Sequence, residues 1–445
     1  MKIYCLFLLL IAFCLCQDSN QQYPGIVASL GISFLNKVKD NYFTRMMEDI
    51  NNLQIEDSNE GKLRMHSMKM NIEIPSSENL QIFFDTQNDG LRFTISNLKA
   101  EVSGRWVFKK SFVKIKGHFN LRGIFDLVGV TFGFTTQEKD GYQIPAVYTK
   151  AVNIETDKHK WKGSFGNNAI EKVGNSIMKA FRNKGVKSIK KKLTDKLQNK
   201  VPTTINRGIK NSIQVEAPLE SWIYMNIATV SPIKVNPDSL SVPLNGTVYI
   251  PGSNVNTKHK ATEVMLNMSN SQNDVLVTAS NYVFDTFTES LNQYDFDYSL
   301  NSNGYSINVF IPGNNNSISI KNTDKGLHFI AQGTCLMLQS RTSFDIKISG
   351  DLTFNFTKGD EQNMFYLHPI INKDSLDIST SNAHLVGQSL GLGILSPIFG
   401  PILEHFSLKL NPKPIPVKKI KDFPFTLSAS STEYTEAHMF ARLDF

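Results

Sequence analysis

Short sequence patterns in the first half of this 445-residue chain return in the second half at a nearly constant offset. The pattern GLRF at residues 90–93 is followed 236 residues later by GLHF at residues 326–329. Residues 113–121 (VKIKGHFNL) likewise resemble residues 345–356 (DIKISGDLTFNF). A repeat of this length predicts one module of about 235 residues present twice, which limits the fold to architectures built from two similar halves.

The hydrophobic pattern predicts the same order of elements in both halves. Apolar residues at every third or fourth position over 26–50 predict one long amphipathic helix. Apolar and polar residues then alternate over 63–135, which predicts half-buried antiparallel strands. A second helical pattern covers 167–213, and Pro202 is expected to kink or break that helix. The corresponding helices of the second half are expected at 281–294 and 386–406. The predicted fold class is therefore α+β.

The first sixteen residues have the pattern of a secretory signal peptide. Lys2 precedes an apolar run that is too short to span a bilayer, and Cys14 and Cys16 occupy the −3 and −1 positions of a cleavage site before Gln17. Cleavage leaves Cys335 as the single cysteine, so no intramolecular disulfide is expected. We expect Cys335 to be a buried thiol, and an intermolecular or redox role stays open. Secretory entry is compatible with release, or with a phagosome or lysosome-like compartment.

Charge and composition divide the mature chain into two domains. Residues 17–230 carry 31 Lys/Arg against 21 Asp/Glu, whereas residues 231–445 carry 15 against 19. The first half is therefore basic and suited to an anionic partner. Four prolines over 231–251 are typical of a linker. We expect a signal peptide at 1–16, a basic N-terminal domain at 17–230, a linker at 231–251 and a second domain at 252–445.

One segment carries a resemblance to a known family. SGRWVFKKSFVKIKGHFNL (103–121) is similar to a segment of the bactericidal permeability-increasing, lipopolysaccharide-binding and phospholipid-transfer protein family. PGIV (24–27), IPSS (74–77), GLRFTISN (90–97) and the closing stretch from residue 423 also fit this family. The resemblance implies two barrel-like domains, each a twisted antiparallel sheet wrapped on a long helix. It further implies a central sheet, to which 415–445 contributes, a boomerang shape and apolar pockets for acyl chains. The family's usual N-terminal disulfide has no counterpart here.

Two basic segments are candidate lipid contacts. With a turn at 109–111, residues 98–107 and 112–121 form a hairpin on which Lys114, Lys116 and His118 share one face, opposite Val113, Ile115 and Phe119. Which face of the first strand carries Trp106 stays open. In the family this hairpin belongs to the lipopolysaccharide-binding tip, which favours headgroup contact over a merely solvated face. The predicted headgroup contacts are Arg105, Lys109, Lys110, Lys114 and Lys116.

The second basic segment, 158–200, holds 13 Lys/Arg and 2 Asp/Glu. Its lysines either are solvated on the outside of an amphipathic helix or contact an anionic membrane. The candidates for membrane contact are Lys187, Lys190, Lys191, Lys192 and Lys196. Inner-face residues Val27, Leu30, Phe34 and Val130 are expected to line an acyl pocket. Asn245, Asn267, Asn315 and Asn355 begin glycosylation sequons, which fit a secreted surface.

Other classes of function have little support. The segment 387–391 (GQSLG) matches the G-x-S-x-G motif, and Asp422 and His438 follow Ser389 in the order found in α/β-hydrolases. That motif requires alternating strands and helices, which the pattern lacks, so no enzyme is predicted. The histidines are scattered, so no metal or other cofactor is expected. The secretory signal and the absence of a known nucleic-acid module argue against nucleic acid as a partner.

The sequence therefore predicts a secreted protein that recognises lipopolysaccharide or phospholipid through its basic tip and acts in antibacterial defence. The alternative is a carrier that transfers phospholipid between host membranes. The oligomeric state stays open.

Overall fold

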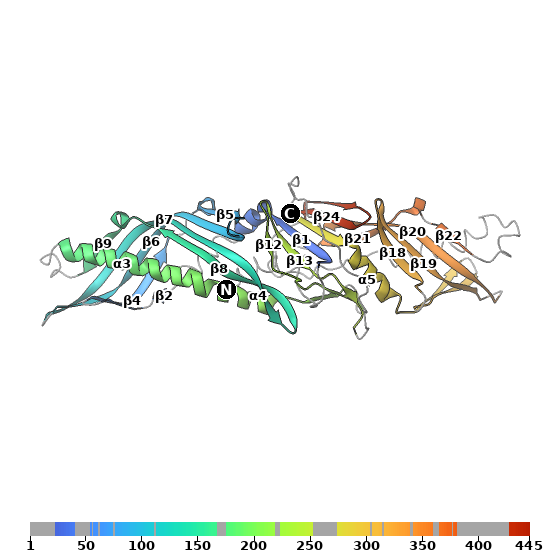
Figure 1. Ribbon diagram of the computed structural model, residues 1–445, viewed down its shortest axis with the longest axis horizontal. Helices are drawn as coiled ribbons and strands as arrows, with labels where there is room; N and C mark the ends of the chain where they lie inside the picture. The colour runs from blue at the N-terminus through green and yellow to red at the C-terminus, as the bar shows by residue number, and fades with distance from the viewer. Residues whose placement is uncertain are drawn as a thin grey trace.

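The computed structural model describes most of the chain. The described residues are 23–40, 54–55, 57–60, 63–73, 76–110, 113–166, 175–218, 223–251, 274–302, 305–313, 316–338, 341–358, 365–375, 377–380 and 427–445. They form an α+β structure made mostly of strands, as predicted. Figure 1 shows an elongated molecule with one curled sheet at each end and a further sheet between them. The expected signal peptide and the helix expected at 386–406 lie outside these residues.

The first curled sheet has eight strands and is antiparallel. Its main path is β2 (Gln54–Ile55), β4 (Leu63–Ile72), β6 (Gly90–Lys110), β7 (Val113–Lys139) and β8 (Tyr142–Glu155). Three short strands pair outside this path, namely β3 (Ser58–Glu60) with β4, β5 (Leu80–Asp85) with β6 and β9 (Lys162–Gly166) with β7. Short 3₁₀ turns lie at η1 (Ser77–Asn79) and η2 (Lys158–Lys160). The alternation over 63–135 thus predicted these strands correctly, because one face of each is buried.

A long helical segment crosses this sheet (Figure 1). It consists of α3 (Asn175–Asp195), the π-helical turn η3 (Lys196–Lys200) and α4 (Val201–Ser212). Pro202 lies in the first turn of α4, directly after the π-helical turn. The predicted interruption at Pro202 is confirmed, because proline has no N–H to donate and its ring clashes with the preceding turn.

The second curled sheet repeats the strand order of the first. Its path is β16 (Phe296–Ser302), β17 (Tyr305–Ile311), β19 (Gly326–Met337), β20 (Thr342–Lys358) and β21 (Phe365–Ile371). β18 (Ile318–Thr323) pairs with β19, as β5 does with β6, and β22 (Asp377–Ser379) pairs with β20, as β9 does with β7. The 3₁₀ turn η4 (Lys373–Ser375) precedes β22. The repeat of strands predicted from the sequence is confirmed.

A six-stranded sheet lies between the two curled sheets (Figure 1). Its order is β12 (Lys234–Val235), β13 (Ser239–Leu244), β1 (Ile26–Gly31), β15 (Val275–Ser280), β24 (His438–Asp444) and β23 (Ala429–Tyr434). β1 and β15 pair antiparallel at its centre, and each precedes a helix. The Gly31 N–H donates to the Asp274 carbonyl at 2.9 Å, and the Ser280 N–H donates to the Gly25 carbonyl at 2.8 Å. The first and second halves of the chain are therefore joined through this pair of strands.

The start of the first half differs from its prediction. Residues 26–31 form the strand β1 rather than the first turns of a helix, and the helix begins at residue 32 and is described to residue 40. All six residues of β1 are buried, and β13 and β15 pair with it along both edges. A strand that is buried on both faces lacks the alternation of apolar and polar residues. The apolar residues of β1 therefore also fitted the period of a helix. Residues 41–50 lie outside the described part of the chain.

The segment expected as a linker, 231–251, is built into sheets. It contributes β12 and β13 to the central sheet, and β14 (Val248–Tyr249) to a small sheet with β10 (Glu216–Pro218) and β11 (Tyr224–Asn226). Every residue of β13 is buried. Its apolar residues Leu240, Val242 and Leu244 explain this, because they pack in the same core as β1. The domain boundaries at 230 and 252 stay predictions, as does the boomerang bend.

Candidate functional site

Basic side chains gather on the outer face of the first curled sheet, where β6 and β7 end and begin. The β6–β7 register places Lys109 opposite Lys114, Val107 opposite Lys116 and Arg105 opposite His118. All of these except the half-buried Val107 are exposed. We name these basic residues, together with Arg64 and His66 of β4, the basic sheet face.

The register makes the basic sheet face a ladder of three rows. Directly opposed side chains lie about 5 Å apart, and successive rows on one face are separated by about 6.6 Å. The ladder therefore extends over about 13 Å. Lys109 and Lys114 are like charges in direct opposition, an arrangement that destabilises a sheet by a few tenths of a kcal/mol to about 1 kcal/mol. This row is therefore not arranged for stability alone.

The neighbouring strand β4 extends two of these rows. Arg64 lies opposite Val107, and His66 lies opposite Arg105. The prediction missed both residues, because it did not pair 63–72 with the hairpin. A bulge follows at Ser67, whose φ is 54° and whose N–H donates to the Asp57 carboxylate at 2.9 Å. The bulge returns Met68 to the inner face, which the alternation in the sequence could not indicate.

The inner face of the same hairpin is apolar. Trp106 is buried, and its indole N–H donates to the His118 carbonyl at 3.1 Å. Gly117 lies opposite it, and a Cβ at Gly117 would come within 2.9 Å of the indole nitrogen. Trp106 therefore faces inward, which settles the orientation that the sequence left open. Phe119 is buried on this face and Ile115 packs against the same core, so the predicted alternation of β7 is confirmed for them.

The turn of the hairpin lies further along than predicted. Lys109 and Lys110 are the last residues of β6 and pair with Lys114 and Val113, so these two residues belong to the strand and not to a turn at 109–111. The physical reason is that backbone pairing continues while both strands present alternating residues, even where the outward ones are lysines. Lys109 consequently stands within the basic ladder. The side chain of Lys110 lies outside the described part of the structure.

One acidic residue borders the basic sheet face. Glu101 accepts hydrogen bonds from Asn120 Nδ2 and from Arg122 Nη2, the latter at 3.1 Å. The hydrogen bond from Asn120, followed by that from Arg122, lowers the pKa of Glu101 below its usual value. Residues 102–125 contain no Asp or Glu. The positive charge of residues 102–125 is therefore not neutralised by any acidic residue within that segment.

The lysines of the second basic segment lie on α3 and on the π-helical turn. Lys187, Lys190 and Lys191 are exposed, while Lys192 and Lys196 are half-buried. Lys192 Nζ donates to the Asp57 carbonyl at 3.4 Å. The opposite stripe of the helix packs against the sheet through Val186, Ile189 and Leu193.

The residues predicted to line an acyl pocket are not all together. Leu30 of β1 and Phe34 of the following helix belong to one apolar cluster, and the Phe34 ring lies 5.6 Å from that of Phe445. Val27 points to the other face of β1, because adjacent residues of a strand alternate. Its assignment to the acyl pocket stays a prediction. Val130 is half-buried and lies opposite Phe93, which packs against both the cluster of Leu30 and Phe34 and the separate cluster of Trp106 and Phe119.

The interior enclosed by α3 and the first sheet is rich in methionine. Met65, Met68 and Met70 of β4 are buried together with Trp106 and Phe119. Methionine side chains are unbranched and polarizable, so such a core adapts its shape more readily than one of branched residues.

The sequons differ in their accessibility. Asn245 is 1% exposed, and its side-chain oxygen accepts hydrogen bonds from the N–H and the hydroxyl of Thr247. The expectation that this sequon marks the surface of the folded chain is therefore wrong, because Asn245 is enclosed between β13 and β14. Asn355 is exposed on β20. Asn267 and Asn315 lie outside the described residues.

Three further features are candidates for chemistry. Ser389 and Asp422 of the hydrolase-like pattern lie outside the described residues, and burial lowers the pKa of His438 at the start of β24. Cys335 is a free, buried thiol on β19, and burial raises its pKa to about 11. The described part of the chain contains no group of three or more metal-ligating side chains. Within that part, no helix is both long and apolar enough to cross a bilayer.

The fold belongs to the class in which two curled antiparallel sheets with similar strand order are joined through a shared sheet. In particular, the structure is similar to the crystal structure of lipopolysaccharide binding protein, with a TM-score of 0.53 and 15% sequence identity. The match covers 95% of this chain and 98% of that one, so the resemblance found in the sequence is confirmed at the level of the fold.

A second match is to Takeout 1 of Epiphyas postvittana. It covers 41% of this chain and 92% of that one at 10% identity, and its TM-score of 0.29 is too low to define a fold. Neither a family model nor a curated protein sequence matches the chain.

Proposed function

We propose that this chain is a secreted lipid-binding protein whose basic sheet face recognises anionic headgroups and whose apolar interior holds acyl chains. The direct opposition of Lys109 and Lys114 carries this proposal. Two exposed ammonium groups in a like-charge row are mutually repulsive, and a phosphate placed between them relieves that repulsion. The similarity in fold to a protein named for binding lipopolysaccharide supports the same conclusion.

The two parts of the site contribute in different ways. Each basic residue near an anionic surface contributes about 1 kcal/mol, and this contribution weakens as salt is added. Each buried CH₂ of an acyl chain contributes about 0.8 kcal/mol, so one long chain outweighs the whole basic sheet face. Headgroup charge therefore sets selectivity and the rate of encounter, and the apolar interior sets affinity. The adaptable methionines Met65, Met68 and Met70 suit an interior that accepts chains of different length.

The proposed action is binding without chemical conversion, and lipopolysaccharide and phospholipid share the phosphate and acyl chemistry that the site requires. A role in antibacterial defence predicts killing of bacteria that decreases with added salt or Mg²⁺. The alternative carrier role predicts exchange of phospholipids with neutral headgroups between membranes. Exposed Asn355 is the glycosylation site that this proposal retains among the described sequons.

Cosedimentation with vesicles tests the headgroup site. Reversing both charges with Lys109→Glu and Lys114→Glu should weaken binding to phosphatidylglycerol vesicles by about 2 kcal/mol or more, which is about 30-fold. Lys321→Glu with Lys325→Glu is a matched control, since both residues are exposed, Lys321 on β18 and Lys325 in the β18–β19 turn of the second half. Unchanged binding by the first double variant, or an equal loss in the control, would reject the basic sheet face as the headgroup site.

A further inference from the structure

We propose that the first half carries two cationic faces that point in opposite directions, so that one molecule bridges two anionic bilayers. The proposal rests on the proposed function for the basic sheet face. It adds a second surface, here named the helix face and defined as Lys187, Lys190 and Lys191 of α3. These three lysines are exposed.

The helix face is strongly basic and lacks acidic neighbours along the helix. Residues 175–194 contain seven Lys/Arg and no Asp or Glu. The buried residues Val186, Ile189 and Leu193 recur at steps of three and four, so they form one stripe. Lys187 and Lys191 lie more than a quarter turn from that stripe at about 100° per residue, and therefore point away from the sheet.

The sheet lies on the other side of this stripe. Val186, Ile189 and Leu193 belong to the same apolar cluster as Trp106, Phe119 and Leu121 of the inner sheet face. The contact is close, because a Cβ added to Gly185 of α3 would lie 2.8 Å from Leu121 Cδ1. Side chains of β7 alternate, so His118 and Lys116 leave the sheet on the face opposite to Phe119. The basic sheet face and the helix face are thus the two outer surfaces of one sheet–helix layer, and Figure 1 shows α3 lying across that sheet.

The thickness of this layer separates the two electrostatic surfaces. A helix with its side chains is about 10–12 Å across, and the sheet with its outer side chains brings the separation to the order of 20 Å. The Debye length is about 8 Å at physiological ionic strength. The charges of each face are therefore screened electrostatically from a bilayer that contacts the opposite face. One flat bilayer that lies against the basic sheet face leaves the helix face directed at solution, where a second anionic surface can bind.

Capture of vesicles by protein on a supported bilayer tests the bridge. The wild-type chain is bound to a supported bilayer of phosphatidylglycerol and phosphatidylcholine, excess protein is washed away, and fluorescent vesicles of the same composition are added. We expect the bound protein to capture them. Vesicles of phosphatidylcholine alone should not be captured. Failure of wild-type protein to capture anionic vesicles would overturn the bridge.

Charge reversal separates the two faces. The triple variant Lys187→Glu, Lys190→Glu, Lys191→Glu should retain at least half of the wild-type binding to the supported bilayer and lose at least 80% of vesicle capture. Lys321→Glu, Lys325→Glu, Lys347→Glu is the matched control, made of exposed lysines of the second half, and should behave like wild type. The neutral triple variant with glutamine at 187, 190 and 191 should lose about half of the capture. If charge reversal disturbs folding, this glutamine variant still tests the helix face.

The outcomes distinguish this proposal from the one on which it rests. Parallel loss of binding and capture in the helix-face variant would mean that both faces contact a single bilayer end-on, which overturns the bridge. Full capture by that variant would mean that a dimer or the sheet face alone joins the vesicles, which also overturns it. Normal binding by the Lys109→Glu, Lys114→Glu variant would instead reject the proposed headgroup site.

Discussion

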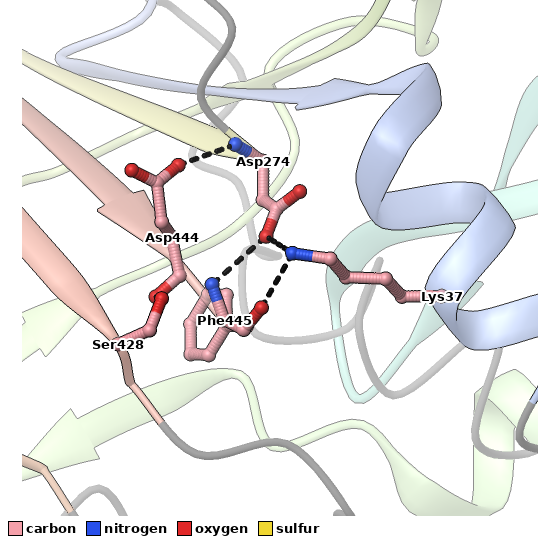
Figure 2. Close-up of polar contacts among 5 residues, drawn as sticks. All are labelled: Lys37, Asp274, Ser428, Asp444 and Phe445. Carbon is pink, nitrogen blue, oxygen red and sulfur yellow. Dashed lines mark hydrogen bonds and ion pairs between the residues drawn. The ribbon is translucent and has the colours of Figure 1, made fainter.

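Lys37 Nζ lies 2.6 Å from Oδ2 of Asp274, although 237 residues separate them in the sequence (Figure 2). Lys37 belongs to the helix after β1, and Asp274 directly precedes β15. The same carboxylate oxygen accepts the N–H of Phe445 at 2.8 Å, and the Asp274 N–H donates to Asp444 Oδ1 at 3.0 Å. The Asp274 side chain is 2% exposed. This ion pair therefore joins segments from the start, the middle and the end of the chain at one buried carboxylate.

Lys37→Met should destabilise the fold by about 2–3 kcal/mol. The substitution leaves the buried Asp274 carboxylate with the Phe445 N–H but without a cation, and an unpaired buried charge is costly. Because the Lys37 side chain is 41% exposed, water compensates in part, and the cost stays below that of a fully buried pair. Denaturant unfolding measures the change.

Lys99→Met is the control for that measurement. Lys99 and Glu73 form an ion pair of similar length, 2.7 Å, but both side chains are more than half exposed. Exposed pairs contribute between zero and about 1 kcal/mol. Equal losses in the two variants would contradict the role assigned to Asp274.

The outward and inward residues of the basic hairpin could be predicted from the sequence because the period of a strand is local. Strand alternation alone was enough to predict that Lys114, Lys116 and His118 point outward. The family resemblance indicated the class of ligand. Pairing between distant strands could not be predicted in this way. Arg64 and His66 join the site through the register of β4 with β6, which a bulge at Ser67 shifts.

The first strand shows a different limit of sequence patterns. The apolar spacing from Val27 through Leu30 to Phe34 satisfies a helical period, yet Val27 and Leu30 belong to a strand buried on both faces. Ser29 is buried as well, and its hydroxyl lies 3.2 Å from that of Ser241. Only the partners of β1 in the central sheet, which come from residues more than 200 positions away, decide between helix and strand there.

Gly123→Ala should destabilise the first half much more than Gly129→Ala. A Cβ at Gly123 would lie 2.1 Å from Cδ2 of Trp161, a buried indole that packs against Phe125 at 5.2 Å and donates to Thr156 at 2.7 Å. At Gly129 the nearest atoms are 3.6 Å away, so a methyl group fits. We expect a loss of about 3 kcal/mol at residue 123 and less than about 1 kcal/mol at residue 129. Thermal unfolding followed by tryptophan fluorescence measures both, and similar melting temperatures would contradict the packing described for Trp161.

Glu101→Gln should strengthen binding to anionic vesicles several-fold. The substitution removes the one acidic side chain that borders the basic sheet face on β6, and its cost in stability is below about 1 kcal/mol because the residue is at the surface. The pKa of Glu101 is lowered in the folded chain, so its stabilising contribution is present above the unfolded value of about 4.3. That contribution is lost as the pH falls through the folded-state pKa.

Two measurements check the Glu101 prediction. Vesicle cosedimentation at pH 7 gives the gain in affinity, and weaker binding by the variant would contradict the electrostatic account. Unfolding at pH 7 and again below pH 4 gives the stability difference between wild type and Glu101→Gln, which should shrink at the lower pH.

Cys335 should be unreactive in the folded protein. Burial raises the pKa of its thiol to about 11, so at pH 8 the thiolate fraction is about one in a thousand. Titration with a disulfide reagent at pH 8 should detect less than a tenth of a thiol per folded chain. In denaturant it should detect one thiol for a chain cleaved before Gln17, and four for a chain that retains its first sixteen residues. Rapid reaction of the folded chain would contradict the burial of β19.

The central claim is that the folded chain takes up lipid. Native mass spectrometry of the purified chain, after incubation with phosphatidylglycerol vesicles and separation from them, tests it most directly. The account predicts a protein mass increased by one or more whole phospholipid molecules, which extraction recovers intact. A chain that keeps its bare mass and yields no extractable phospholipid would contradict the account.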